Sequence, residues 1–143
     1  MRVREMTKRD ARAAAELSGQ LGYPSTVAQI ERRFDGVSGD PESAVLVVED
    51  EDGRVVGWVH VLGRWFLESD RFAEIGGLVV DAAARRKGAG KALVSAAESW
   101  AASRGYDTMR VRSNVKRVEA RGFYEAAGYV ILKAQNVYEK TLR

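Results

Sequence analysis

Residues 78–106, LVVDAAARRKGAGKALVSAAESWAASRGY, decide the fold of this chain, because they run from a strand through a glycine-containing turn into a helix. From Lys91 onward, small and apolar residues recur at the helical period, and Gly105 stands where a C-terminal cap belongs. Two glycines, Gly88 and Gly90, open this helix. The stretch therefore predicts a strand, a tight turn and a long helix in direct succession.

The turn has the features of an anion site. Free N–H groups gather at the start of a helix, where the helix dipole also favours negative charge. Gly88 and Gly90 let a phosphate approach the backbone, and Arg85, Arg86 and Lys87 add positive charge around it. A tight strand-to-helix turn with exposed cations is the structural alternative.

Two better-known phosphate loops do not fit this turn. A P-loop requires Gly at position 85 and Ser or Thr at 92, where this chain has Arg85 and Ala92. A dinucleotide fingerprint requires Gly at position 93, which is Leu93. The preceding strand, FAEIGGLVV at 72–80, contains a pair of glycines that indicate a bulge or a closely approached backbone. A diphosphate joined to an amide-rich arm that lies along this strand describes coenzyme A.

Length and composition favour one globular domain over residues 1–143, since 143 residues with 45% hydrophobic content can bury one core. The net charge of +3 is only mildly basic. The chain has no cysteine, so it can form neither a disulfide framework nor an acyl-cysteine intermediate, and a cytoplasmic location is favoured. No stretch resembles a signal peptide or a membrane span, and no metal-ligand spacing is present.

The remaining patterns predict a mixed α/β fold. A strand and two helices come first, Thr26 and Gln29 forming a capping box for the second helix. A hairpin follows over AVLVV and RVVGWVHVLGRW, then the strand at 72–80, the helix and a strand at DTMRVRS. A helix over VEARGFYEAA and two strands, YVILK at 129–133 and VYEKTL at 137–142, complete the expected order. This order predicts a mixed sheet with helices on its faces.

A second block, SNVKRVEARGFYEAAGY at 113–129, accompanies the strand-turn-helix stretch. Together the two blocks resemble the GNAT superfamily of N-acetyltransferases, with Arg85, Gly88 and Gly90 in one signature and Asn114 and Tyr124 in the other. The resemblance covers nearly all of the chain. It implies a GNAT-like acyl-CoA N-acyltransferase fold, with a mixed, mostly antiparallel sheet of about seven strands flanked by four helices. It also implies acetyl-CoA as the cofactor and a homodimer as one assembly state.

The resemblance assigns the cofactor contacts. The backbone of the strand end would pair with the pantetheine arm, and the turn would hold the diphosphate. The residues concerned are Leu78, Val79, Val80, Arg85, Arg86, Lys87, Gly88, Ala89, Gly90, Lys91, Asn114 and Tyr124. Asn114 has an equal alternative as a cap for the next helix. Many relatives have Pro where this chain has Ala82, and a small residue at Arg86, but neither change removes a backbone donor.

Acetyl transfer to an amine requires a proton acceptor, an oxyanion donor and a proton for the departing thiolate. Glu74, in the strand before the glycine pair, is the candidate base, with a solvated carboxylate as the alternative reading. A backbone N–H freed by the bulge can hold the oxyanion. Tyr124, whose phenol pKa near ~10 exceeds the ~8.5 of a thiol, is the candidate acid by resemblance, with a buried structural tyrosine as the alternative. Without a cysteine nucleophile, direct transfer in a ternary complex is the simplest mechanism.

By resemblance, the acceptor lies against the first two helices and the loop at 63–72. These segments offer Tyr23, Trp65 and Phe66 for apolar contact and Glu68 and Asp70 for a cation, which suits an amine on a small molecule or a peptide. The single histidine, His60, reads as structural. Two other functions stay open: a CoA-binding regulatory domain without catalysis and a nucleic-acid binder. The second is disfavoured because no aromatic residues alternate with the cations of the turn.

Overall fold

A five-stranded sheet organises residues 1–112 of the computed structural model, which describes the whole chain, residues 1–143. The strands stand side by side in sequence order, and β1 to β4 are antiparallel while β5 is parallel to β4. Their bounds are β1 Arg2–Glu5, β2 Ser43–Glu49, β3 Val55–Phe66, β4 Ser69–Val80 and β5 Met109–Val111. Residues 113–143 form a second compact unit, described separately below.

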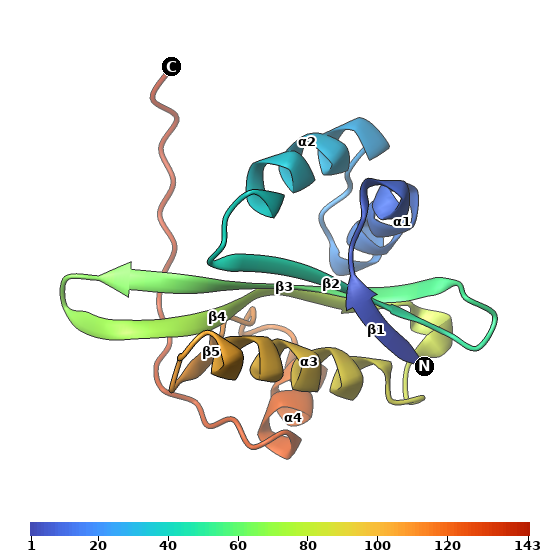
Figure 1. Cartoon of the computed structure of the whole chain (residues 1–143). Helices are drawn as coiled ribbons and strands as arrows, with labels where there is room; N and C mark the ends of the chain where they lie inside the picture. The colour runs from blue at the N-terminus through green and yellow to red at the C-terminus, as the bar shows by residue number, and fades with distance from the viewer. The chain divides into compact units, whose positions relative to one another are not determined.

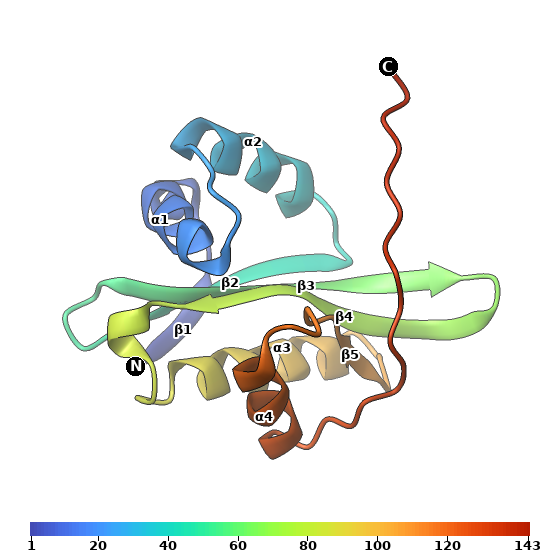
Figure 2. The same ribbon diagram turned by 180° about the vertical axis from the view of Figure 1, so that it is seen from behind.

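Helices cover both faces of this sheet. A 3-10 turn, Lys8–Asp10, leads into α1, Ala11–Leu21, which lies with α2, Val27–Ser38, on one face, while α3, Ala89–Ser103, lies on the other (Figures 1 and 2). The central strands are consequently sealed from water, and Val47, Val48, Val59 and Val61 have no exposed surface. No helix in the structure has both the length and the apolar run that a membrane span requires.

The capping box predicted for the second helix is present, and similar bonds fix the 3-10 turn that precedes the first helix. Gln29 N–H donates to Thr26 Oγ1 at 3.1 Å, and Thr26 N–H donates to Gln29 Oε1 at 2.9 Å. Thr7 N–H donates to Asp10 Oδ2 at 2.8 Å, and Arg4 donates to both oxygens of the same carboxylate at 2.8 and 2.9 Å. These bonds connect β1 to the first helical turn.

The β3–β4 hairpin contains the predicted irregularity at the glycine pair. His60 pairs with Gly77, but the next residue, Val61, pairs with Ile75, so Gly76 is an extra residue on β4. A Cβ atom on Gly77 would lie 2.9 Å from the Trp58 ring, which explains why that position holds glycine. The predicted bulge is therefore confirmed, and Gly76 itself is exposed.

Residues 113–143 contain one helix, α4, Val118–Ala126, which ends before Gly128 at φ 96°. The prediction of strands at 129–133 and 137–142 is wrong in this structure, because residues 130–143 adopt no regular secondary structure. The sheet thus has five strands rather than about seven. Alternating apolar residues indicate strand propensity, yet a strand also requires a hydrogen-bonding neighbour, and these side chains are largely exposed, with Val130 at 87% and Tyr138 at 89%.

Candidate active site

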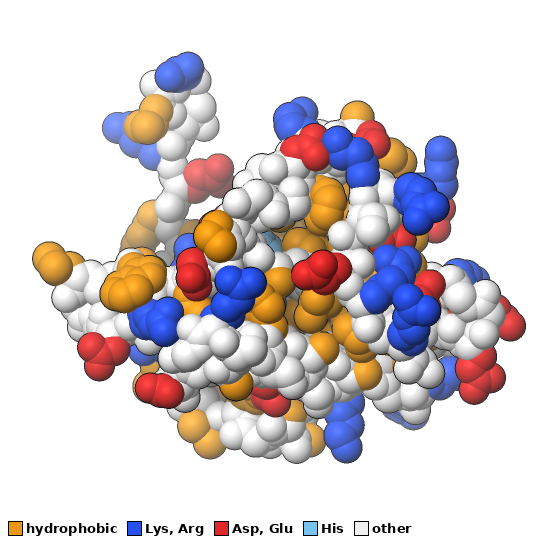
Figure 3. Space-filling model, viewed as in Figure 1, with side chains coloured by type: hydrophobic (Ala, Val, Ile, Leu, Met, Phe, Trp, Pro, Cys, Tyr) orange, Lys and Arg blue, Asp and Glu red, His pale blue; other side chains and the backbone are white.

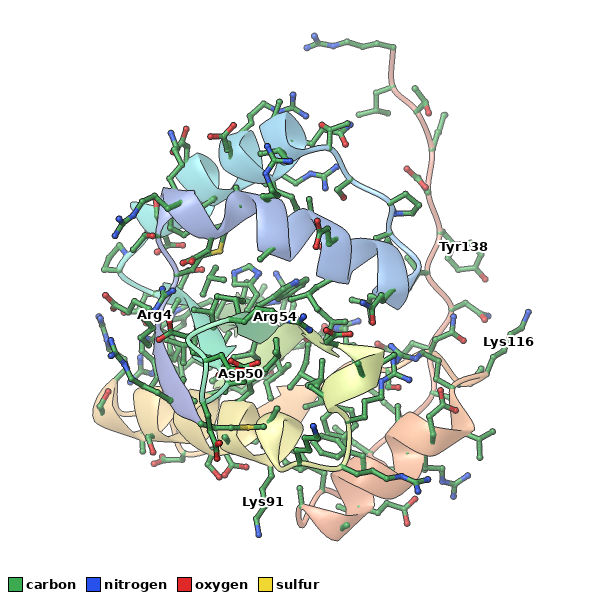
Figure 4. All side chains as sticks on the ribbon, turned by 90° about the vertical axis from the view of Figure 1, so that its right-hand side faces the viewer. Arg4, Asp50, Arg54, Lys91, Lys116 and Tyr138 are labelled. Atoms are coloured by element: carbon green, nitrogen blue, oxygen red, sulfur yellow. The ribbon has the colours of Figure 1, made fainter.

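The turn between β4 and α3 has the backbone geometry of an anion cradle. Gly88, directly before α3, has φ 90°, and Arg86 has φ 68°, the one non-glycine residue with positive φ. Left-handed residues next to right-handed ones turn successive N–H groups toward one point. The first turn of α3 adds its own free N–H groups and the positive end of the helix dipole. Lys91 projects from that turn toward solvent (Figure 4).

Side chains from other elements brace the beginning of this turn. Asp81 accepts a hydrogen bond from Arg54 at 2.6 Å, and its Oδ1 accepts from Ala83 N–H at 3.2 Å. Gln20, on α1, accepts from Ala82 N–H at 2.9 Å. Hydrogen bonding, led by the Ala83 N–H, lowers the pKa of Asp81, so the carboxylate stays charged and keeps its partners. The path from β4 to the cradle is therefore fixed by contacts with α1 and with the β2–β3 turn.

One edge of β4 is open beyond the bulge. β5 pairs with β4 only at Ala73, Glu74 and Ile75, so no strand lies beside residues 76–80 on that side. On the other side, these residues pair with β3 as far as Val80. An extended ligand with amide groups can therefore add to this edge as a strand would. The edge leads directly to the cradle at the start of α3.

A cleft of about 750 Å³ lies on the other side of the bulge, between the first two helices and the sheet. Its wall is mostly apolar, with Leu21, Ile30, Phe34, Val45 and Trp58 among its residues, and Gly76 and Gly77 form part of its floor. Figure 3 shows apolar side chains in the hollow beneath α2. Tyr23, a predicted acceptor residue, lines this cleft and is 69% exposed. The cleft volume is that of a small-molecule site.

The polar side chains of the cleft are few, and no carboxylate lines it. Ser18 Oγ donates to Ala14 O at 2.8 Å, while Ser25 Oγ accepts from Arg33 at 2.9 Å. His60 Nε2 lies 2.9 Å from Ser43 Oγ. Burial, and secondarily the charge of Arg64, lowers the pKa of His60 below its ordinary value, so its ring is neutral at pH 7.

Glu74 is held by two arginines. Arg64 Nε donates to Glu74 Oε2 at 3.0 Å, and Arg112 Nε donates to Oε1 at 2.6 Å. The residue is only 2% exposed, which rules out the alternative reading of a solvated carboxylate at a strand end. Because each oxygen already accepts a charged hydrogen bond, the structure gives Glu74 a role in joining β4 to β3 and to Arg112, which directly follows β5.

The other predicted acceptor residues do not join Tyr23. Trp65, Phe66 and Asp70 line a separate pocket of about 430 Å³ at the end of the β3–β4 hairpin, and Glu68 lies in the hairpin turn. Trp65 is 72% exposed, and Arg71 lies over its ring at 5.8 Å. The family resemblance had suggested one acceptor surface, but the 12-residue strand β3 places these residues away from the cleft.

Tyr124 and Asn114 lie in the unit 113–143. Burial raises the pKa of the Tyr124 phenol, an effect only partly offset by Arg117, so the hydroxyl keeps its proton well into the alkaline range. The Phe123 ring meets the Tyr124 ring edge to face at 5.1 Å. Asn114 Oδ1 accepts from Lys116 N–H at 2.9 Å, a local turn that precedes α4, whose N-cap is Arg117, so Asn114 does not cap this helix.

Sequence reasoning missed most of the cleft. Trp58 and His60 lie on one side of β3 by period two, but nothing in that period indicates that this side faces the first two helices. Ile30 and Phe34 follow the helical period of α2, which indicates an apolar helix face but not the strand that it meets. Pairing the two apolar faces, one on a strand and one on α2, was the signal that could have found the cleft.

The chain is similar to known acetyltransferases over nearly its whole length. Residues 7–129 match the model of the acetyltransferase (GNAT) family. An aminoglycoside N(6')-acetyltransferase type 1 of Klebsiella aerogenes is 31% identical over 103 residues, which cover 70% of this chain and 68% of that protein. The crystal structure of glucosamine-6-phosphate N-acetyltransferase from Arabidopsis thaliana superimposes with a TM-score of 0.81 at 26% identity, covering 99% of this chain and 98% of the other. The aminoglycoside acetyltransferase AAC(6')-Iy, solved in complex with CoA, has a TM-score of 0.81 at 17% identity, covering 98% and 99% of the two chains.

Proposed function

This chain belongs to the GNAT family of acetyltransferases and transfers an acetyl group from acetyl-CoA to an amine, and we propose that its acceptor is a small molecule whose amine is carried on an apolar body. The observation that carries the proposal is the apolar cleft that meets the bulged Gly76 and Gly77. The acceptor would enter from the side of the first two helices, while the cofactor follows the open edge of β4.

Cofactor binding would use backbone groups in two places. The pantetheine amides would pair with the open edge at residues 78–80, and the diphosphate would sit at Arg86 to Lys91. The left-handed Arg86 and Gly88 support this arrangement, because they turn N–H groups toward one point ahead of α3. Arg85 and Lys87 are exposed and would add positive charge at the rim.

The chemistry proposed is direct transfer. An N–H beyond the bulge, between Leu78 and Val80, would bind the oxyanion, and Tyr124 would protonate the departing thiolate. Its raised pKa supports the acid role, because the phenol remains protonated when the thiolate forms. For the proton of the amine, the base suggested by the sequence, Glu74, would have to act through water and against its two hydrogen bonds with arginines.

The acceptor class follows from the charges of the cleft. Its only permanently charged lining residue is Arg33, and burying an ammonium without a carboxylate is costly. Aminoglycosides, named as substrates of the relatives, carry several ammonium groups, whereas an arylalkyl amine or an amino acid presents one. An anionic group on the acceptor would also find Arg33 at the cleft. The hairpin residues Trp65, Phe66, Glu68 and Asp70 would contact the acceptor only if it is extended, such as a peptide.

Thiol release from acetyl-CoA across a panel of acceptors tests this function. The panel contains arylalkyl amines, aromatic amino acids, polyamines, aminoglycosides and short peptides. We expect the highest kcat/KM for monoamines with an apolar body. A higher kcat/KM for aminoglycosides would contradict the acceptor class while leaving acetyl transfer intact.

The alternative of a regulatory domain without catalysis is not favoured by the relatives, which are named as acetyltransferases. The nucleic-acid alternative has little support, because two arginines of the basic stretch at 110–117 have partners within the protein. Arg112 pairs with Glu74, and Arg110 lies over the Phe72 ring at 4.0 Å.

A homodimer and a cytoplasmic location are also proposed. The large apolar side chains exposed between Val130 and Leu142 support self-association, since such surface is usually covered by a partner. Light scattering at several protein concentrations would detect the dimer. The cytoplasmic location is supported by the need for acetyl-CoA, an intracellular metabolite, and cell fractionation would test it.

A further inference from the structure

His60 is placed at the meeting point of the cleft and the bulge. It pairs with Gly77 across the β3–β4 ladder, and His60, Gly76 and Gly77 all line the cleft. A Cβ atom added to Gly76 would lie 3.9 Å from His60 Nδ1. The Nδ1 side of the ring therefore lies beside the exposed bulged residue, next to the strand edge that would carry the thioester.

The other ring nitrogen is engaged. Ser43, on β2, places its hydroxyl 2.9 Å from Nε2. When Nε2–H donates to this hydroxyl, the lone pair of a neutral imidazole is on Nδ1, facing the bulge. In this tautomer Ser43 holds Nε2 while Nδ1 is available to accept a proton on the side of the bulge.

No other side chain of the cleft can take this role near neutral pH. The hydroxyl of Ser18 is bonded to a backbone carbonyl, the Trp58 indole nitrogen can only donate, and Arg33 is always charged. Tyr23 is largely exposed. Glu74 does not line the cleft, and its oxygens are occupied.

On these grounds we propose that His60 Nδ1 accepts the proton that the acceptor amine loses during acetyl transfer. This inference rests on the proposed function. The amine nitrogen attacks the thioester carbonyl carbon, a C–N bond forms, and the carbonyl π electrons move to oxygen. Nδ1 then takes a proton from the positively charged nitrogen. As the C=O bond forms again, the C–S bond breaks, sulfur leaves with the bonding electrons and is protonated, and His60 later releases its proton to water.

The charges around His60 suit this step. Arg64, four residues along β3, is held by Glu74, while Arg33 and Tyr23 lie on the helical side of the cleft. The lowered pKa keeps the ring neutral before the reaction, and the nitrogen of the tetrahedral adduct is far more acidic than a free ammonium. Proton transfer is therefore favourable only after attack.

The test compares the wild type with His60→Gln, which cannot accept a proton but can keep a hydrogen bond to Ser43. We expect kcat to fall by roughly 100-fold or more, the scale of general base catalysis. In the wild type, kcat should fall as pH drops below the pKa of His60, under 6.5, and this limb should be absent in the variant. The affinity for CoA and the melting temperature of the variant should equal those of the wild type. If His60 had a purely structural role, its replacement would lower them.

A second variant, His60→Ala, leaves space for added imidazole. Substituted imidazoles of higher pKa should restore a higher kcat, because the rate of general base catalysis rises with the basicity of the added base. If the added molecule only filled the cavity, the restored kcat would depend on its size instead. A His60→Gln enzyme whose kcat lies within about threefold of the wild type, or whose kcat falls in acid as that of the wild type does, would reject the role of His60. That result would leave the proposed function intact. A wild type that binds CoA and acetylates no amine would overturn the proposed function together with the role of His60.

Discussion

At the scale of single residues, Tyr124 is the strongest candidate for the acid. Replacing it with phenylalanine removes one hydroxyl and keeps the ring that packs against Phe123. We expect kcat to fall roughly tenfold or more while the affinity for acetyl-CoA stays nearly constant, because the lost bond forms only as the thiolate departs. Since burial raises the pKa of Tyr124, the alkaline loss of wild-type kcat should lie above pH 10 and should disappear in the variant. Stopped-flow or steady-state thiol release measures both, and an unchanged kcat would reject the acid role.

Gly88 allows a second test of one residue. The structure shows open space around a Cβ at this position, so the expected defect comes from the backbone at φ 90°, which a valine adopts at a cost of about 1–3 kcal/mol. Gly88→Val should thus reshape the cradle and abolish CoA binding in calorimetry without unfolding the protein. The matched control is Gly36→Ala in α2, where space is also open but φ is not left-handed. It should keep the CoA affinity and gain up to about 1 kcal/mol of stability. Equal CoA affinity in both variants would exclude the turn as the diphosphate site.

At the scale of elements, the ion pair of Arg4 and Asp10 attaches β1 to the first helical turn. The hydrogen bonds from Arg4 and Thr7 lower the pKa of Asp10, although burial opposes them. Asp10→Asn should cost about 1–2 kcal/mol of unfolding free energy at pH 7, because a quarter of the Arg4 side chain is exposed and water replaces part of the interaction.

The pH dependence of this variant has a definite sign. The unfolded chain binds the Asp10 proton more tightly than the folded one, so the stabilisation is complete above pH 3.8 and is lost as pH falls through the lower folded pKa. Wild type and Asp10→Asn should therefore converge in acid. Asp35→Asn is the control, because its partner Lys8 is 52% exposed and the pair should contribute less than about 1 kcal/mol. Denaturant unfolding at several pH values measures both, and a pH-independent difference would contradict the ionic account.

The elements also show how far sequence patterns reach. Periodicity and turn residues predicted β4, the cradle and α3, since local chemistry determines each: glycines at positive φ, a helical repeat and a left-handed Gly105 at the end. The bulge was predicted because Gly76 and Gly77 are poor strand residues. Strands at 129–133 and 137–142 were predicted only from the alternation of apolar and polar residues. This alternation does not show whether a neighbouring strand is present to form hydrogen bonds. The two hydrogen bonds to Glu74 likewise come from Arg64 and Arg112, which are ten and 38 residues away in the chain. No local sequence pattern predicts that these arginines lie beside Glu74.

At the scale of the whole molecule, the question is whether residues 1–112 and 113–143 unfold as one domain, as the sequence predicted. The cradle and the open edge belong to the first unit, and Tyr124 belongs to the second. Acetyl transfer that uses both requires them to act together, so ligand binding should stabilise both. A ligand at a free concentration of 100 times its Kd adds about 2.7 kcal/mol to the unfolding free energy of any region that must be folded to bind the ligand.

Hydrogen exchange with and without CoA tests this coupling. We expect amides of α3 and of α4 to gain protection by similar factors, about 100-fold at 100 times Kd, because both would exchange only through an opening that releases the ligand. Amides of residues 130–143, which lack regular secondary structure in the free chain, serve as the reference for local exchange. If α3 gains protection and α4 does not, the cofactor binds to the first unit alone, and Tyr124 cannot be the group that protonates its sulfur.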